Sequence, residues 1–167
     1  MNLCAIGTGA ITKSMLAEFK RSDVLHCTAI YSRKEETGRA MAEEFGLEKV
    51  FTSMEEMLAD ASIDMVYVAS PNSIHYSQTK AALLAGKHVI CEKPCTTTES
   101  QTRELFALAK ERNLFLMEAQ KMLFLPAVLA PVLSLLVLFL LAVLVSYFPL
   151  VLLLLMHSFF QKQFSSN

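Results

Sequence analysis

The strongest constraint on the fold is the stretch DMVYVASPNSIHYSQTKAALLAGKHVICEKP at residues 64–94. Residues 65–69 form an apolar, β-rich run that predicts a strand buried on both faces. A helix is expected over residues 74–85, where Gly86 would end it, and residues 87–91 predict a second buried strand. A strand, a crossover helix and a strand of this length form a right-handed unit with parallel strands.

Polar residues follow both strands of this unit. Ligands of open parallel sheets bind beyond the carboxyl ends of the strands. We therefore expect one ligand-binding rim to contain Ser70, Pro71, Asn72, His75, Glu92 and Lys93. Three of these residues also have a plainer interpretation. Asn72 is suited to capping the helix, His75 to exposure on its first turn, and Glu92 to pairing with a nearby lysine.

The amino-terminal residues predict an anion-binding turn. A short apolar strand over residues 3–6 leads into a glycine-rich turn and a helix that begins near Thr12. Gly7 permits the tight turn, and Gly9 lets the backbone approach a pyrophosphate at the positive end of the helix. The expected cofactor contacts here are Gly7, Thr8, Gly9, Ala10 and Ile11. One face of the helix is expected to carry Ile11, Met15, Leu16 and Phe19.

The second strand, expected over residues 25–31, ends in a polar and basic tripeptide. Folds specific for NAD place an acid here to hold the ribose diol. This chain has Ser32, Arg33 and Lys34 instead. An arginine binds a 2′-phosphate with two parallel hydrogen bonds, which favours NADP over NAD. The alternative is a solvated loop whose cations pair with Glu35 and Glu36.

The remaining pattern completes an α/β sheet. Further helices are expected from residue 35 to 45, after a capping box at Ser53 and Glu56, and after an N-cap at Thr98 with Gln101. Short strands are expected at residues 50–51 and 114–117, and the latter would place Glu118 on the ligand-binding rim. Six strands separated by helices predict a doubly wound parallel sheet of the Rossmann type.

The segments SPNSIH and CEKP, joined by a helix, resemble the nucleotide-binding domain of the Gfo/Idh/MocA oxidoreductase family. The resemblance runs from residue 1 to about Pro126. It implies an enzyme that uses NAD or NADP to oxidise or reduce sugars, polyols and related diols by hydride transfer. It also implies that Lys93 is the catalytic residue, placed beside the nicotinamide and the substrate hydroxyl.

Charge and cysteine usage limit the other classes of function. The formal net charge is −1, so nothing indicates a nucleic-acid partner. The cysteines show neither a CxxC pair nor a metal-binding spacing with histidine. Cys4, Cys27 and Cys91 fall in predicted strands as buried thiols, whereas Cys95 is expected to be more exposed. Reduced thiols, and the absence of a signal peptide before the first strand, favour the cytoplasm.

The composition changes abruptly near residue 122. No Asp, Glu, Lys or Arg occurs between Lys121 and Lys162, where the sequence is rich in leucine. We expect a dinucleotide-binding domain over residues 1–121 and an apolar helical tail over residues 122–167. The stretch between Pro131 and Pro149 would span about 26 Å as a helix at about 1.5 Å per residue, close to the thickness of a bilayer core.

Two explanations compete for this tail. The family continues after the FLP sequence into a second α/β domain that holds the substrate. Either the coding frame is broken after about Pro126, or the tail is a membrane anchor through residues 122–160 that leaves the Rossmann domain in the cytoplasm. The sequence therefore supports three hypotheses: an oxidoreductase that is inactive as this truncated chain, a non-catalytic dinucleotide-binding module, and a tail-anchored membrane protein.

Overall fold

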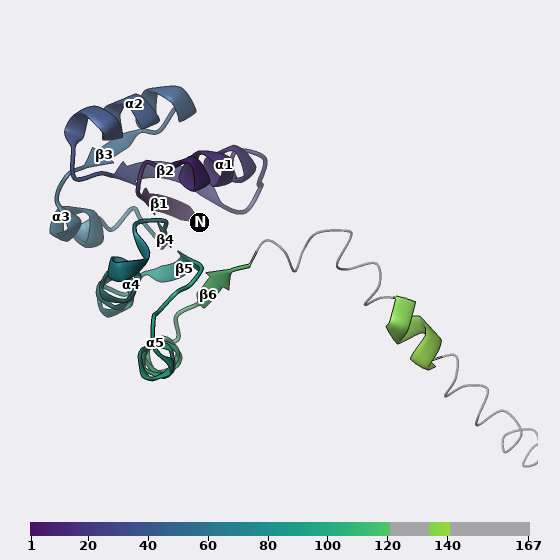
Figure 1. Cartoon of the computed structure of the whole chain (residues 1–167). Coiled ribbons are helices and arrows are strands. Elements are labelled where there is room, and N and C mark those ends of the chain that lie inside the picture. Colours follow the sequence, from purple (N-terminus) through teal and green to yellow (C-terminus); the bar gives the residue numbers. More distant parts are fainter. Residues whose placement is uncertain (121–133, 141–167) are drawn as a thin grey trace, which may run out of the picture. The chain divides into compact units, whose positions relative to one another are not determined.

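A computed structural model describes residues 1–120 and 134–140 of the chain. Residues Met1–Gln120 form one compact unit, in which strands and helices alternate (Figure 1). The strands are β1 (Asn2–Ile6), β2 (His26–Tyr31), β3 (Lys49–Phe51), β4 (Met65–Val68), β5 (His88–Glu92) and β6 (Leu116–Ala119). The helices are α1 (Ala10–Phe19), α2 (Glu35–Phe45), α3 (Met54–Ala59), the 3-10 turn η1 (Asn72–Ile74), α4 (His75–Leu84) and α5 (Glu99–Glu111).

The six strands form one sheet in the order β3-β2-β1-β4-β5-β6, and every pair is parallel. Strand order reverses between β1 and β4, which pair from Leu3 with Met65 to Ile6 with Val68. This is the order of the doubly wound Rossmann sheet, in which a ligand crevice opens beyond the carboxyl ends of the two strands at the reversal. The predicted fold class is therefore confirmed for residues 1–120.

Helices cover the two faces of the sheet in separate groups. On one face, α1 and α2 pack against β1, β2 and β4 through a cluster that includes Leu3, Leu16, Ile30, Met41 and Tyr67. Phe19 of α1 meets Tyr67 of β4 edge-on, with ring centroids 5.5 Å apart. On the other face, α3, α4 and α5 pack through a cluster that includes Met57, Val66, Leu83, Val89 and Leu105. The strands are apolar on both sides because helices lie on both sides.

Several predicted boundaries shift when the elements pack. Helix α1 begins at Ala10, and Gly9 is its N-cap. This turns Thr12 fully into the interface with the sheet, at 0% exposure, and leaves Ile11 40% exposed, so the prediction that Ile11 faces the core was wrong. The spacing of apolar residues alone does not decide which face packs, because that face also depends on where the helix begins.

The two later strands start and end further along the chain than the sequence suggested. The β6 register pairs Val89 with Leu116, so β6 begins after Phe115 and includes Glu118 as a strand residue. Lys87 precedes β5, whose pairing with β4 begins at His88 opposite Met65. The two helix caps agree with prediction, since Ser53 Oγ accepts from Glu56 N and Thr98 Oγ1 accepts from Gln101 N, each at 3.3 Å.

The cysteines are all free thiols in the described residues. Cys95 is only 3% exposed, so the expectation of an exposed thiol was wrong. It packs in the cluster of the α4 and α5 face, below the loop that follows β5.

The tail is described only over residues 134–140, which are helical. Within the described ranges, no helix is long and apolar enough to cross a membrane. The rest of the apolar segment, including the proposed anchor and the boundary near Pro126, lies outside the described residues. The division into domains at residues 121 and 122 therefore stays a prediction.

Candidate functional site

A cleft of about 750 Å³ opens at the carboxyl ends of β1, β2 and β4. It lies at the strand-order reversal, where the topology places a ligand. Of the residues predicted from sequence, its lining contains Gly7, Thr8, Gly9, Ser32, Arg33, Lys34, Ser70 and Pro71. It also contains Ile6, Tyr31, Thr37, Ala69, Ile74 and Gln78, which the sequence analysis had not assigned to the site.

The glycine turn after β1 fits closely against the end of β4. Gly7 has φ +104°, and a Cβ there would lie 2.5 Å from the carbonyl oxygen of Ala69, so only glycine is accommodated. Its N–H donates to the Tyr31 carbonyl at 3.2 Å, which ties β1 to β2. A Cβ on Gly9 would instead meet nothing within 4 Å. The first N–H groups of α1 therefore adjoin open space beside the cleft, as an anion-binding turn requires.

The segment after β2 presents two cations to the cleft. Ser32 is buried, shares a hydrogen bond with Thr37 Oγ1 at 2.7 Å, and accepts from Lys34 N at 3.3 Å. Arg33 and Lys34 are exposed, and neither side chain forms a hydrogen bond or ion pair with another described residue. Glu35 is bound to Arg39 instead. The cations are thus available to a ligand, contrary to the alternative in which they pair with the adjacent acids.

The turn after β4 is ordered by residues of α4. Ser70 Oγ donates to Gln78 Oε1 at 2.5 Å. Asn72 begins η1 and is exposed; it lies outside the residues that line the cleft, and its carbonyl accepts from His75 N at the end of the turn. Gln78 was missed from sequence, although its place three residues after His75 puts both on the same face of α4.

His75 lies behind this turn and is 1% exposed, so the plainer alternative of an exposed histidine was wrong; the residue also lies outside the cleft lining, and its predicted contact with a cofactor stays a prediction. Its Nδ1 lies 2.8 Å from the Pro94 carbonyl oxygen, and its Nε2 lies 2.7 Å from the Ser70 carbonyl oxygen. The ring therefore bridges the turn after β4 and the loop after β5.

The loop after β5 carries the candidate catalytic lysine. Lys93 is exposed and lies outside the lining of the cleft, whereas Glu92 is buried and accepts from the Tyr67 hydroxyl at 2.6 Å. Burial, and then this bond to Glu92, raise the pKa of Tyr67 well above its ordinary value, so the phenol remains a donor. Glu92 thus has a buried partner within the sheet in place of the lysine partner that the sequence suggested.

Glu118 contacts the same loop from β6. Its Oε2 accepts from Cys95 N at 2.8 Å, and its Oε1 accepts from Gln120 Nε2 at 2.6 Å. The structure therefore places Glu118 beneath the loop after Lys93 and away from the cleft lining. A hydrogen bond from the Cys91 thiol lowers the pKa of Cys95, and this bond together with burial raises the pKa of Cys91.

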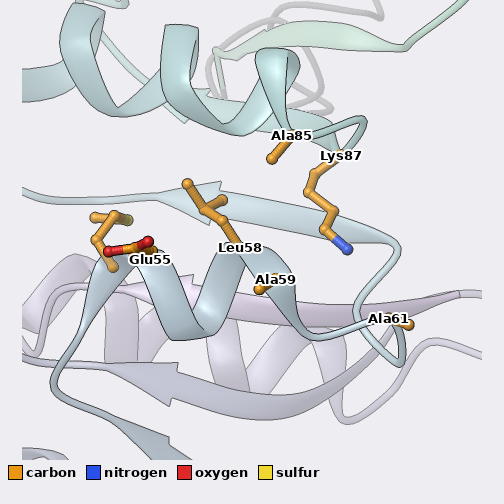
Figure 2. A pocket seen from close by; sticks show the side chains of 7 residues that line it. Glu55, Leu58, Ala59, Ala61, Ala85 and Lys87 are labelled. Carbon is orange, nitrogen blue, oxygen red and sulfur yellow. The ribbon is translucent and has the colours of Figure 1, made fainter.

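A second hollow, of about 760 Å³, lies between α3 and the end of α4, with Ala61 and Lys87 lining it just before β4 and β5 begin (Figure 2). Its lining is mostly apolar and consists of Met54, Glu55, Leu58, Ala59, Ala61, Ala85 and Lys87. The Lys87 ammonium donates to the carbonyls of Asp60 at 2.9 Å and Ile63 at 2.8 Å. Lys87 therefore fastens the connection between α3 and β4.

The strand order, the glycine turn and the cleft at the reversal define a dinucleotide-binding domain of the Rossmann type. Residues 1–120 match the family model described as "Oxidoreductase family, NAD-binding Rossmann fold" (GFO_IDH_MocA), and the chain belongs to this family. The resemblance noted in the sequence is thereby confirmed.

Individual relatives show the extent of the match. The chain is 39% identical over 126 residues to the uncharacterized oxidoreductase YgjR of Escherichia coli, which covers 75% of this chain and 38% of that protein. It is 38% identical over 121 residues to the scyllo-inositol 2-dehydrogenase (NADP(+)) IolU of Bacillus subtilis, which covers 72% of this chain and 37% of that protein. The chain thus spans under two fifths of the length of these relatives.

A solved structure gives the same picture of the fold. The 3-ketoreductase KijD10 of Actinomadura kijaniata, in complex with TDP-benzene and NADP, superposes with a TM-score of 0.68 at 37% identity. The match covers 71% of this chain and 37% of that one.

Proposed function

We propose that this chain is the nucleotide-binding part of an NADP-dependent oxidoreductase that acts on sugars, polyols or diols by hydride transfer. The observation that carries the proposal is the pair of cations, Arg33 and Lys34, which border the cleft without a described partner. The named activities of IolU and KijD10, a polyol dehydrogenase and a ketoreductase solved with NADP, agree with it.

The described residues fit a bound dinucleotide. Gly9 leaves open space at the start of α1, where a pyrophosphate would contact the first N–H groups of the helix, including those of Ala10 and Ile11. Arg33 and Lys34 would hold the 2′-phosphate of NADP, with the Ser32 hydroxyl beside them. NAD lacks this phosphate, so NAD binding is possible but weaker.

The turn after β4 and the loop after β5 would border the nicotinamide end. The nicotinamide supplies the hydride chemistry when the dinucleotide is bound. Lys93 would hold or give up a proton at Nζ toward a substrate hydroxyl or carbonyl. Ser70 and Pro71 would orient the dinucleotide, and Glu92 stays fixed by Tyr67.

We expect the chain to bind a dinucleotide without measurable turnover. Holding a substrate carbon against the nicotinamide can supply about 7–11 kcal/mol of the barrier reduction. In this family the groups that hold a sugar come mainly from a second α/β domain, and within residues 1–120 the resemblance assigns a catalytic role to Lys93 alone, which is exposed. The expected state is therefore a cofactor-binding domain that requires its substrate domain.

Calorimetric titration of the full chain with NADPH and NADH tests the proposal. Tighter binding of NADPH supports it, and equal affinity would remove the 2′-phosphate assignment. A parallel screen of sugars, inositols and vicinal diols, followed by NADPH absorbance, tests turnover. Turnover that disappears in Lys93→Ala would show that the chain builds a substrate pocket without the second domain.

A further inference from the structure

The loop that carries Lys93 is fixed through its neighbours. Lys93 itself is exposed and makes no side-chain hydrogen bond to another described residue. The next two backbone groups are both held by side chains from other elements, since the Pro94 carbonyl contacts His75 of α4 and Cys95 N donates to Glu118 of β6. The position of Lys93 therefore depends on those two contacts.

Only one of the two contacts also reaches the cleft. Glu118 is bound to Cys95 and Gln120, neither of which lines the cleft. His75 is bound to Pro94 on one side and to Ser70 on the other, and Ser70 lines the cleft. We propose that His75 is a positioning residue, which couples the cleft-lining turn at Ser70 to the loop that carries Lys93. This inference rests on the proposed function only in naming the cleft ligand as NADP.

The chemistry of the ring makes the coupling two-sided. A carbonyl oxygen only accepts hydrogen bonds, and a neutral imidazole has one N–H. The two ring nitrogens lie 2.8 Å and 2.7 Å from the two carbonyl oxygens, so the ring N–H donates to one carbonyl while the ring is held between both. Because the ring is buried, neither carbonyl has water as a ready substitute, so loss of His75 would leave both loops without a partner.

The same helix offers a matched control. Gln78 lies three residues further along α4 and binds Ser70 through its side chain, but no contact joins it to the Lys93 loop in the described residues. Loss of Gln78 should therefore disturb the cleft turn alone. Leu83 of α4 is fully buried in the core, and its side chain makes neither of the two loop contacts. Its substitution therefore shows the effect of lost core packing alone.

Hydrogen exchange of the full chain tests the coupling. His75→Leu should speed exchange of residues 93–98 by about five- to ten-fold, the effect of one lost buried hydrogen bond. Gln78→Ala and Leu83→Ala should change this segment less, even where Leu83→Ala lowers overall stability as much. NADPH at the cleft should slow exchange of residues 93–98 in the wild type and fail to do so in His75→Leu. Equal exchange in His75→Leu and Leu83→Ala, or protection that persists without His75, would overturn the proposal.

Two further measurements cover the remaining cases. If the leucine variant does not fold, His75→Asn, whose side-chain amide keeps N–H donors, should still speed exchange of residues 93–98, because one short amide does not reach both carbonyls. A long-range ¹H–¹⁵N spectrum of the wild-type chain should show a His75 ring N–H that exchanges slowly with solvent, and rapid exchange of that N–H would refute the buried bridge. If NADPH does not bind the wild type, the proposed function fails, while the cofactor-free exchange difference still decides the role of His75.

Discussion

Two hollows of nearly equal volume lie toward opposite ends of the parallel strands, called here the carboxyl edge and the amino edge of the sheet. The one at the carboxyl edge is lined by a glycine turn, hydroxyls and two cations that no described side chain engages. The one at the amino edge is lined by Met54, Glu55, Leu58, three alanines and Lys87, whose ammonium is already bound by two carbonyls (Figure 2). Volume does not separate the two hollows, but their cations do: Arg33 and Lys34 have no side-chain partner among the described residues, whereas Lys87 has two carbonyl partners.

This difference follows from the direction of the strands. In a parallel sheet all carboxyl ends meet at one edge, where the loops are free to carry ligand-binding residues. The connections at the amino edge only return the chain to the next strand, so their polar groups are satisfied internally. We expect substitutions at the carboxyl edge to alter ligand binding and those at the amino edge to alter stability alone.

The largest expected effect comes from Gly7→Ala at the carboxyl edge. The added Cβ would lie 2.5 Å from the Ala69 carbonyl at φ +104°, so strain and overlap together should cost at least about 3 kcal/mol of unfolding free energy and abolish NADPH binding. Gly46→Ala is the control, because Gly46 also has positive φ, +71°, but has open space around it; it should cost about 1–2 kcal/mol. Urea unfolding measures both. Equal losses of unfolding free energy in the two variants would show that the close approach of Gly7 to the Ala69 carbonyl does not add to the cost of positive φ.

The next largest effect is expected at the amino edge, from loss of the Lys87 ammonium. Lys87→Met should lower the unfolding free energy by about 3 kcal/mol, because two buried carbonyls lose a charged donor. NADPH affinity should not change. Lys80→Met removes an exposed, solvent-screened pair with Glu104 and should lower the unfolding free energy far less. Chemical denaturation with parallel calorimetry gives both quantities, and weakened NADPH binding in Lys87→Met would break the separation between the two edges.

A smaller effect, on affinity alone, is expected for Arg33→Ala. Loss of a charged hydrogen bond to the 2′-phosphate should weaken NADPH by about 1.5–3 kcal/mol and leave NADH and stability nearly unchanged. Arg39→Ala is the matched control, since that guanidinium is bound to Glu35 on the same helix and does not line the cleft. Calorimetric titration distinguishes them. The same loss for both dinucleotides would contradict recognition of the 2′-phosphate.

The smallest effect concerns pH at the amino edge. The hydrogen bond from Lys49, and then those from Ser62, hold the pKa of Asp60 below its ordinary value. A depressed pKa adds stability above the unfolded-state pKa of about 3.9, and this stability is lost as the pH falls through the lower, folded-state value. Lys49→Met should therefore be less stable than the wild type at pH 7, and the gap should narrow below about pH 4. Urea midpoints measured for both proteins from neutral to acid pH test this. A stability difference that stays constant with pH would mean that ionised Asp60 does not stabilise the fold through Lys49.

Local patterns were sufficient to predict much of the fold. The parallel unit at residues 64–94, the glycine turn and the tripeptide at Ser32 depend on contiguous residues, so spacing and residue type identified them. Thr12 is buried and Ile11 is exposed, the reverse of what the apolar pattern suggests, because the buried face of α1 depends on the helix beginning after Gly9.

Contacts between distant loops could not be predicted in this way. His75 is buried because carbonyls at Ser70 and Pro94 converge on it, and Cys95 is buried because Glu118 draws its backbone toward β6. Each contact joins residues of different elements whose approach depends on the assembled sheet. A histidine at the start of a helix carries no local sign of such a partner, although its position beside a strand-end turn is consistent with one.

The residue at the end of β2, Tyr31, gives the cleft an optical property. The chain contains four tyrosines and no tryptophan, and Tyr31 lines the cleft while Tyr67 lies buried against Glu92. Ultraviolet emission from this protein is therefore tyrosine emission, without the stronger indole signal that usually obscures it. A ligand with a nicotinamide or adenine ring in the cleft would quench or accept the emission of Tyr31 directly, so that occupancy of the cleft can be read from the unlabelled, unmodified chain.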